Sequence, residues 1–225
     1  MAGFRAIPPC GGSGQQSPGV IPLPPHVSTA PEVVSLFVFG HVGLSISAFS
    51  AYSWADGKWR ADSSLHQIDY RAVMVGAMLP DIVDKPLGLW IAPDLVDHSL
   101  RSIAHSLLFG LLVLAIGGLF LVARRRPRAM LLGIASSGHL IMDRMWSNPT
   151  ILLWPFLGWE FAAEYPGIGE WASGHLTNLL TFFTDIPELF GFLAIVGFTA
   201  QILRPGNLKR FLATGAAVSP QRVGP

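Results

Sequence analysis

The chain contains few charged residues, and this restricts the possible classes of protein more than any other feature of the composition. Only 13% of its 225 residues are charged, whereas 51% are hydrophobic and the mean hydropathy is +0.47. A soluble domain carries about 25% charged residues, so a soluble fold of this length could not cover its surface with charge. We therefore expect an integral membrane protein that has the lipid bilayer as its partner.

Cysteine and net charge are also low, and each excludes a class of protein. Cys10 is the single cysteine, so the chain cannot be a secreted scaffold built on internal disulfides. The net charge is only +1 and no basic stripe is present, so we expect no nucleic-acid partner. The composition leaves the oligomeric state open.

The two ends of the chain are expected to be disordered. Residues 1–30 hold six prolines and five glycines, with no apolar run as long as that of a signal peptide. Residues 213–225 are expected to form a similar, shorter end. The expected helical membrane domain then covers residues 31–212.

Apolar stretches of spanning length fill most of that domain. About 20 apolar residues cross the bilayer core as a helix. Five stretches approach that length: Val33–Trp54, Arg71–Trp90, Ser102–Ala123, Ala129–Trp146 and Ile186–Leu203. We predict an all-α, polytopic membrane bundle with about five spans, the second interrupted near Pro80 and Asp81 because proline disrupts helical hydrogen bonding. Ile151–Ala163 is shorter, and its aromatic residues favour an interfacial or re-entrant segment.

Lysine and arginine predict the orientation, because cytoplasmic segments are enriched in both. With the N-terminus outside, the inner segments hold eleven of the fifteen cations. The outer side keeps Arg5, Arg101 and Arg144, and Lys85 lies inside the second stretch. We therefore expect the N-terminus outside and the C-terminus in the cytoplasm.

Ionisable side chains inside the apolar stretches are the main functional signal. Such groups are costly in a membrane, and a functional role is their default explanation. His139 and Asp143 are four residues apart, so a helix presents both on one face. His98, Arg101 and His105 lie on one helical stripe if the third helix begins early.

Under the expected orientation, histidine or aspartate falls in the outer half of four different stretches. The five residues concerned are His41, Asp81, His105, His139 and Asp143. A bundle can bring such a layer together into one site with nitrogen and oxygen ligands. Imidazole and carboxylate without thiolate suit a divalent metal, with zinc expected first and manganese or iron as alternatives.

Structural explanations compete with the metal site. His41 alone is equally well explained by an interhelical hydrogen bond. Asp143 is also explained by an ion pair with Arg101 or Arg144. For His139 together with Asp143, a pair of metal ligands is favoured over a structural hydrogen bond.

The order of these motifs resembles that of the YdjM-like family, bacterial and archaeal inner-membrane proteins described as metal-dependent hydrolases. The residues that carry the resemblance are Gly40-His41, Leu79-Pro80-Asp81, His98-Ser99-Leu100-Arg101, His105–Phe109, Gly138–Asp143 and Trp154-Pro155-Phe156. The order is also similar to that of zinc-dependent phospholipase C proteins, which bind metal through such residues. The resemblance covers about Phe39 to Phe156 and implies a hydrolase in a prokaryotic inner membrane. One departure is Lys85 directly after Asp84, which we expect to neutralise Asp84.

These features together predict a membrane-bound hydrolase that uses a metal-activated water near the outer membrane face. Its substrate is expected to be a phosphoester or a lipid-linked compound, with Arg101 holding an anionic group. His98 is expected to act as general acid or base, or as a further metal ligand. The loop 158–185 is expected to cover the substrate. Two other functions stay open: a transporter of protons or metal ions, and a non-catalytic scaffold whose buried polar residues form interhelical hydrogen bonds.

Overall fold

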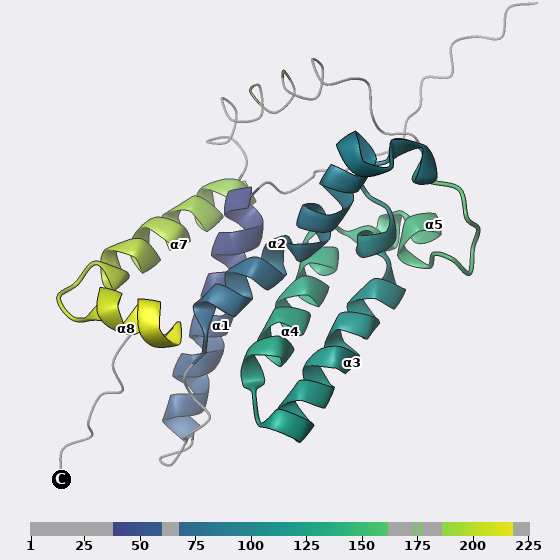
Figure 1. The fold of residues 1–225 in the computed structure, drawn as a ribbon. Coiled ribbons are helices and arrows are strands. Elements are labelled where there is room, and N and C mark those ends of the chain that lie inside the picture. Colours follow the sequence, from purple (N-terminus) through teal and green to yellow (C-terminus); the bar gives the residue numbers. More distant parts are fainter. Residues whose placement is uncertain (1–37, 60–67, 162–172, 174–175, 177–185, 218–225) are drawn as a thin grey trace, which may run out of the picture. The chain divides into compact units, whose positions relative to one another are not determined.

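The structure, a computed structural model, describes residues 38–59, 68–161, 173, 176 and 186–217 (Figure 1). Regular structure in these ranges is helical throughout and includes seven α-helices, which confirms the all-α prediction. The expected N-terminal tail and most of the expected substrate-covering loop lie outside the described residues.

Five helices pack side by side in the order α7, α1, α2, α4 and α3 (Figure 1). Their bounds are α1 (Val38–Trp59), α2 (Tyr70–Pro86), α3 (Leu107–Arg124), α4 (Pro127–Met142) and α7 (Ile186–Ile202). Two shorter helices, α5 (Pro149–Leu152) and α8 (Asn207–Thr214), follow α4 and α7 along the chain. Because only Arg125 and Arg126 connect α3 to α4, these two helices form a tight antiparallel hairpin.

Small residues let the helix backbones approach closely, as they do in many membrane bundles. α1 crosses α7 at Gly43 and Gly191, and a Cβ atom on Gly43 would overlap the backbone of Gly191. α2 crosses α4 at Gly76, where a Cβ atom would overlap the backbone of Leu132. The second crossing lies little more than one turn before Asp81, so it sets the spacing of the two helices beside that carboxylate.

Among the described helices, α3 is the one that is both long and apolar enough to cross a membrane. It has 18 residues with a mean hydropathy of 2.4, and only 11% of them are buried. α7 and α8 qualify together as a second candidate, bent by 107°. The prediction of about five spans is therefore not confirmed in the described part of the chain. α2 and α4 contain 17 and 16 residues. They measure about 24–26 Å, less than the roughly 30 Å of hydrocarbon core.

The second stretch is not interrupted at Pro80. α2 runs from Tyr70 through Pro80 to Pro86, and the backbone changes only beyond it, in a π-helical turn at Leu87–Ile91 and a 3₁₀ turn at Pro93–Leu95. Proline removes the hydrogen bond of its own nitrogen but leaves the rest of the helix bonded. Pro80 is fully buried, so the packing of α2 offsets that single lost bond.

The third helix begins later than the sequence predicted. α3 starts after Ser106, whose side chain caps it by accepting a hydrogen bond from the Phe109 N–H at 3.1 Å. His98 and Arg101 therefore lie in irregular backbone, and His105 ends a 3₁₀ turn. These three residues do not share a helical stripe.

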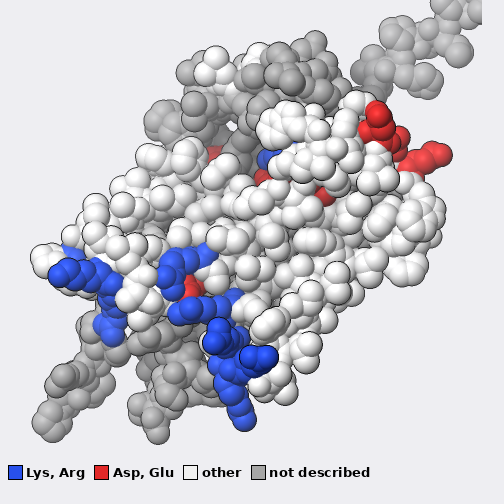
Figure 2. All heavy atoms as spheres, in the orientation of Figure 1, with Lys and Arg blue, Asp and Glu red and all other residues white. Residues whose placement is uncertain are grey.

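Figure 2 shows charged residues of opposite sign gathered at opposite ends of one face. Lysine and arginine lie where α3 turns into α4 and around α8, and exposed acidic side chains lie toward the other end (Figure 2). The exposed cations of this group are Arg124, Arg125, Arg126, Arg128, Arg204 and Lys209, and the exposed acids include Asp94 and Asp97. Arg144 is also exposed and lies just beyond the opposite end of α4 from Arg128. Between the two groups, large apolar side chains of α3 and α7 are exposed. An apolar band between two charged rims is the surface expected of helices embedded in lipid.

Asp69 links helix ends at the cationic end of the bundle. Its buried carboxylate accepts hydrogen bonds from the N–H, Nε and Nη2 groups of Arg71, at 3.1, 2.9 and 2.9 Å. It also lies 2.8 Å from Arg128 Nε at the start of α4, and Arg71 Nη1 donates to the Leu212 carbonyl at the end of α8. Burial alone would raise the pKa of Asp69, but the hydrogen bonds and charges of Arg71 and Arg128 hold it below its usual value.

The packed part of the chain extends to Ala217, beyond the expected boundary at residue 212. The Gly215 carbonyl accepts a hydrogen bond from the Tyr70 N–H at 3.0 Å, and Ala216 and Ala217 are buried. Gly215 has a φ of +81°, in the left-handed region that glycine adopts without strain. This residue turns the chain from the end of α8 toward the start of α2.

Replacing Asp69 by asparagine is expected to lower the free energy of unfolding by about 1.5–3 kcal/mol, the usual contribution of hydrogen bonds to a charged group. The folded-state pKa of Asp69 is lowered, so its stabilisation is complete above the ordinary value of about 4 and declines as the pH falls through the folded value. Thermal unfolding in detergent from pH 7 to pH 3 measures both effects, with the exposed Asp94→Asn as control. A stability difference that stays constant down to pH 3 contradicts this role.

Candidate metal centre

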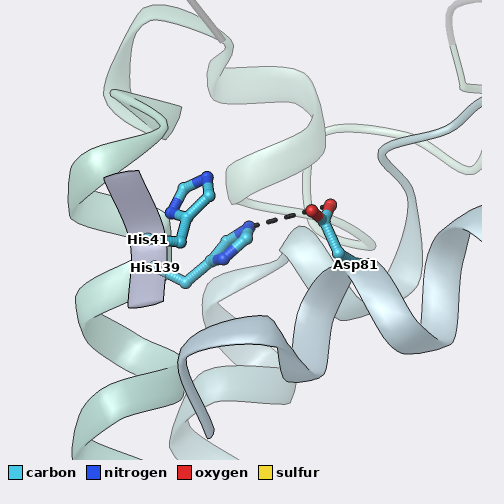
Figure 3. A group of neighbouring side chains, drawn as sticks. All are labelled: His41, Asp81 and His139. Carbon is cyan, nitrogen blue, oxygen red and sulfur yellow. Dashed lines mark ion pairs between the residues drawn. The ribbon is translucent and has the colours of Figure 1, made fainter. Parts of the chain in front are cut away.

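The five side chains predicted as metal ligands meet inside the bundle. They are His41 on α1, Asp81 on α2, His105 in the turn before α3, His139 on α4 and Asp143 directly after α4. Each is at most 7% exposed. Figure 3 shows His41 and His139 lying ring against ring, with Asp81 facing them from α2. The fold therefore brings four separate segments of the chain together in one buried polar cluster.

Hydrogen bonds hold both His105 and His139 with a proton on Nδ1. His105 Nδ1 lies 2.7 Å from the Asp84 carboxylate, and His139 Nδ1 lies 2.7 Å from the Ala77 carbonyl. Carboxylate and carbonyl oxygens only accept hydrogen bonds, so each Nδ1 donates. In a neutral imidazole the other nitrogen, Nε2, then carries a free lone pair. Both histidines therefore present Nε2 in the form that binds metals.

These two Nε2 atoms face each other at 3.3 Å, with carboxylate oxygens around them. Asp81 Oδ1 lies 3.6 Å from His105 Nε2 and 3.9 Å from His139 Nε2. Asp143 Oδ2 lies 3.7 Å from each of the two nitrogens. Four electron-pair donors thus converge in an apolar interior. Their mutual repulsion is relieved only by positive charge at the centre, supplied by a metal ion or by protonation of the histidines.

The spacing of these atoms fits a small divalent ion. Zinc–nitrogen bonds of about 2.0–2.1 Å in a tetrahedral site place two nitrogens roughly 3.3–3.4 Å apart, and the Nε2–Nε2 distance is 3.3 Å. Two groups of three residues have ligand atoms within 4.8 Å of one another, namely His41, Asp81 and His139, and His105, His139 and Asp143. Imidazole nitrogens with carboxylate oxygens suit zinc, manganese or iron.

His41 closes the cluster on the side of α1. Its ring stacks on that of His139, with centroids 3.9 Å apart and an interplanar angle of 16°. His41 Nε2 lies 3.0 Å from Asp143 Oδ1, but the two atoms are not aligned for a hydrogen bond, and both are buried. Buried polar atoms without a hydrogen-bond partner are rare in folded proteins, so these two atoms are further candidates to bind an ion.

Asp84 holds His105 in place. Its fully buried carboxylate accepts hydrogen bonds from the N–H groups of Ser102, Ala104 and His105, from the Ser102 hydroxyl and from His105 Nδ1, at 2.7–3.1 Å. A carboxylate behind a ligating histidine fixes its tautomer and orientation and raises its basicity. The same hydrogen bonds satisfy the backbone N–H groups of the irregular segment before α3. At membrane depth, such non-helical backbone is tolerated only where protein buries it.

Two cations contact the candidate carboxylate ligands. Arg101 Nε lies 3.1 Å from Asp143 Oδ2, the ion pair that was one of the expected alternatives for Asp143. Lys85 Nζ lies 2.7 Å from Asp81 Oδ2. The expectation that Lys85 neutralises Asp84 is therefore wrong, because residues four apart share a helix face and adjacent residues do not.

His98 lies apart from the buried ligands. Half of its side chain is exposed, its φ is +55°, and its Nε2 lies 3.5 Å from Asp94 Oδ1. It belongs to neither group of candidate ligands. The sequence connected His98 to the site through a helix that begins early, and the structure has no such helix, so we assign no chemical step to it.

Sequence reasoning did not include Asp84 and Lys85 in the candidate site. The signal that identifies them is Asp-x-x-Asp-Lys from Asp81 to Lys85, three ionisable residues within five positions of an apolar stretch. Such a concentration of charge is costly in a membrane unless the residues share a polar site. The structure shows both side chains in direct contact with a candidate ligand.

The fold and the cluster together define a class, that of helical membrane proteins with a candidate metal site buried between the helices. The chain belongs to the YdjM inner membrane protein family, whose family model matches residues 37–208. This match confirms the family recognised from the motif order, includes all five candidate ligands and extends to the start of α8. Membership implies an inner-membrane lipid environment. No curated protein and no solved structure matches the chain.

Asp84→Asn is expected to weaken zinc binding about 10–100-fold, the usual effect of losing the group behind a metal-ligating histidine. Asparagine keeps one acceptor oxygen, and its amide introduces donors beside the donors that already surround Asp84. Competition with a zinc chelator measures the affinity of the detergent-purified protein, with the exposed Asp94→Asn as control.

Elution volume and thermal unfolding of the metal-free proteins separate a folding defect from an altered site. If folded Asp84→Asn binds zinc as tightly as the parent, Asp84 does not position His105 for the metal.

Proposed function

We propose that the protein is a membrane-bound, metal-dependent hydrolase with zinc as its first candidate metal. The proposal is carried by the convergence of two imidazole Nε2 atoms and two carboxylate oxygens at 3.3–3.9 Å. His105, His139, Asp81 and Asp143 would hold the ion, with His41 as a further ligand. Catalytic zinc sites use nitrogen and oxygen ligands of this kind and keep one position for water or substrate.

When bound, a divalent metal supplies an acidified water and polarises a phosphoryl or acyl oxygen. The residues of the chain prepare this chemistry. Asp84 and the Ala77 carbonyl keep His105 and His139 in the metal-binding tautomer, so neither imidazole has to lose a proton when metal enters. His41 Nε2 and Asp143 Oδ1 are buried 3.0 Å apart without a hydrogen-bond partner, so both are available as further ligands.

The surroundings of the site favour a phosphoester or lipid-linked substrate. Arg101 contacts Asp143 from a less buried position, with 18% of its side chain exposed, and a guanidinium binds anionic oxygens through several N–H groups. The irregular backbone between α2 and α3 exposes Trp90, Ile91 and Leu95. Apolar side chains beside a buried polar site suit a substrate that has both a lipid tail and an anionic head.

We also propose that the cationic end of the bundle faces the cytoplasm. This end includes the α3–α4 turn, whose exposed arginines Arg124, Arg125 and Arg126 lie at the end of the most apolar helix (Figure 2). Cytoplasmic loops are rich in Lys and Arg, and anionic lipids of the inner leaflet attract such clusters. The exposed acidic residues Asp94 and Asp97 would then lie outside.

The purified parent protein is expected to contain about one zinc ion per chain by mass spectrometry, and His139→Ala and Asp143→Ala are expected to lose it. Each substitution removes a candidate ligand atom that faces the centre of the cluster. Ser137→Ala is a matched control, because the Ser137 hydroxyl on the same helix bonds only to the Gly133 carbonyl. Full zinc content in a folded His139→Ala protein contradicts the site.

The same proteins test the reaction. A screen of phosphoester and lipid substrates is expected to find hydrolysis by the zinc-loaded parent that falls about 100-fold or more in His139→Ala. Flux of zinc or protons into liposomes, without hydrolysis of any substrate in the screen, would instead favour a transporter.

The orientation is tested with single cysteines in a Cys10→Ser background. Asp94→Cys is expected to react with a membrane-impermeant maleimide on intact spheroplasts, whereas Pro205→Cys, in the turn between α7 and α8, is expected to react only after lysis. Both positions are exposed in the structure, so lack of access reflects the membrane and not packing. The reverse labelling pattern would place the N-terminal side in the cytoplasm.

A further inference from the structure

Lys85 is a cation at the candidate metal centre that the proposed hydrolysis does not use. Its Nζ donates to Asp81 Oδ2 at 2.7 Å, and the other oxygen of the same carboxylate, Oδ1, faces the Nε2 atoms of His105 and His139. One carboxylate therefore separates the ammonium group from the position where the four donor atoms converge. A third of the Lys85 side chain is exposed, so a ligand can approach the ammonium group from outside the cluster.

Lys85 can donate more hydrogen bonds than the one that Asp81 accepts. An ammonium group has three N–H donors, and the Asp81 carboxylate accepts one of them. A partly exposed ammonium group stays hydrated on its open side, because burying a charge is costly. The donors that Asp81 does not use are therefore available to a ligand that approaches from that side.

The charges of the site point to an anionic partner. Asp81, Asp84 and Asp143 carry three negative charges, and Lys85 and Arg101 carry two positive charges. A divalent ion adds two more, so the loaded site holds one net positive charge with neutral histidines. Without Lys85 the same site would carry no net charge, so Lys85 supplies the excess positive charge that favours an anionic ligand.

We propose that Lys85 binds the phosphoryl group of an anionic substrate beside the metal, which makes Lys85 a substrate-binding residue of the proposed hydrolase. The inference rests on the proposed function, because the metal forms the other half of the subsite. An ammonium group on an aspartate ligand and a metal on the opposite oxygen of that aspartate can contact neighbouring oxygens of one phosphate. Arg101 differs from Lys85, because its Nε contacts Asp143 Oδ2, the same oxygen that faces the two Nε2 atoms.

The test is calorimetric titration of the zinc-loaded, full-length protein in detergent with inorganic phosphate and, separately, with short-chain phosphatidylglycerol. Lys85→Met is expected to keep the zinc content of the parent and to bind phosphate at least about tenfold more weakly, the loss expected for one charge-assisted contact. Lys85→Arg is expected to retain most of the affinity, and Lys209→Met, on the exposed side of α8, is expected to retain all of it.

The two ligands distinguish the source of the phosphoryl group. Weakened binding of both supports recognition of phosphate irrespective of its carrier, and weakened binding of the lipid alone supports a lipid headgroup. Should Lys85→Met fail to fold, Lys85→Gln is titrated in its place.

Unchanged binding of both ligands to a zinc-loaded variant overturns the role of Lys85 and leaves the hydrolase proposal standing. Loss of zinc from folded Lys85→Met also overturns it, since Lys85 would then act only on the metal ligand Asp81. A parent protein that holds no zinc refutes the proposed function itself, and the two failures are therefore distinct.

Discussion

Two imidazole nitrogens that face each other at 3.3 Å inside the bundle are the constraint on which the rest of this structure depends. In an apolar bundle, lone pairs 3.3 Å apart with carboxylate oxygens beside them raise the free energy of the folded chain. They persist only because stronger bonds hold the opposite edges of both rings, from the Asp84 carboxylate and from the Ala77 carbonyl. This repulsion is the feature that makes the cluster a candidate metal site.

α2 contributes more of the groups that surround these two nitrogens than any other helix. Within three turns it supplies the carbonyl that orients His139, the candidate ligand carboxylate of Asp81, the carboxylate of Asp84 that orients His105, and the ammonium group of Lys85. The bond from His139 to Ala77 spans the contact between α4 and α2, directly after Gly76. The close approach permitted by Gly76 is thus a requirement of the site as well as of the packing, because a wider spacing would carry His139 away from its carbonyl.

The sequence predicted the helical class and the set of candidate ligands because both depend on composition and on polar groups in apolar surroundings. His139 and Asp143 could be placed together because four residues make one helical turn. The beginning of α3 could not be predicted, since it depends on the Ser106 cap and on backbone bonds to Asp84 from a distant helix. About five spans were predicted, and one or two candidates are found among the described helices. Hydropathy measures composition, whereas helix length is set by where tertiary contacts end each helix. The continuity of α2 through Pro80 likewise depends on packing that one chain segment cannot reveal.

The shortness of α2 and α4 has a consequence for the lipid around them. At about 24–26 Å they are shorter than the hydrocarbon core of an ordinary bilayer, and lipids next to such helices adapt to the mismatch by thinning. Thinning draws the headgroup layer inward, toward the end of α4 where Asp143 and the other candidate ligands lie. The lengths of these two helices would therefore set how closely the lipid headgroups approach the buried cluster.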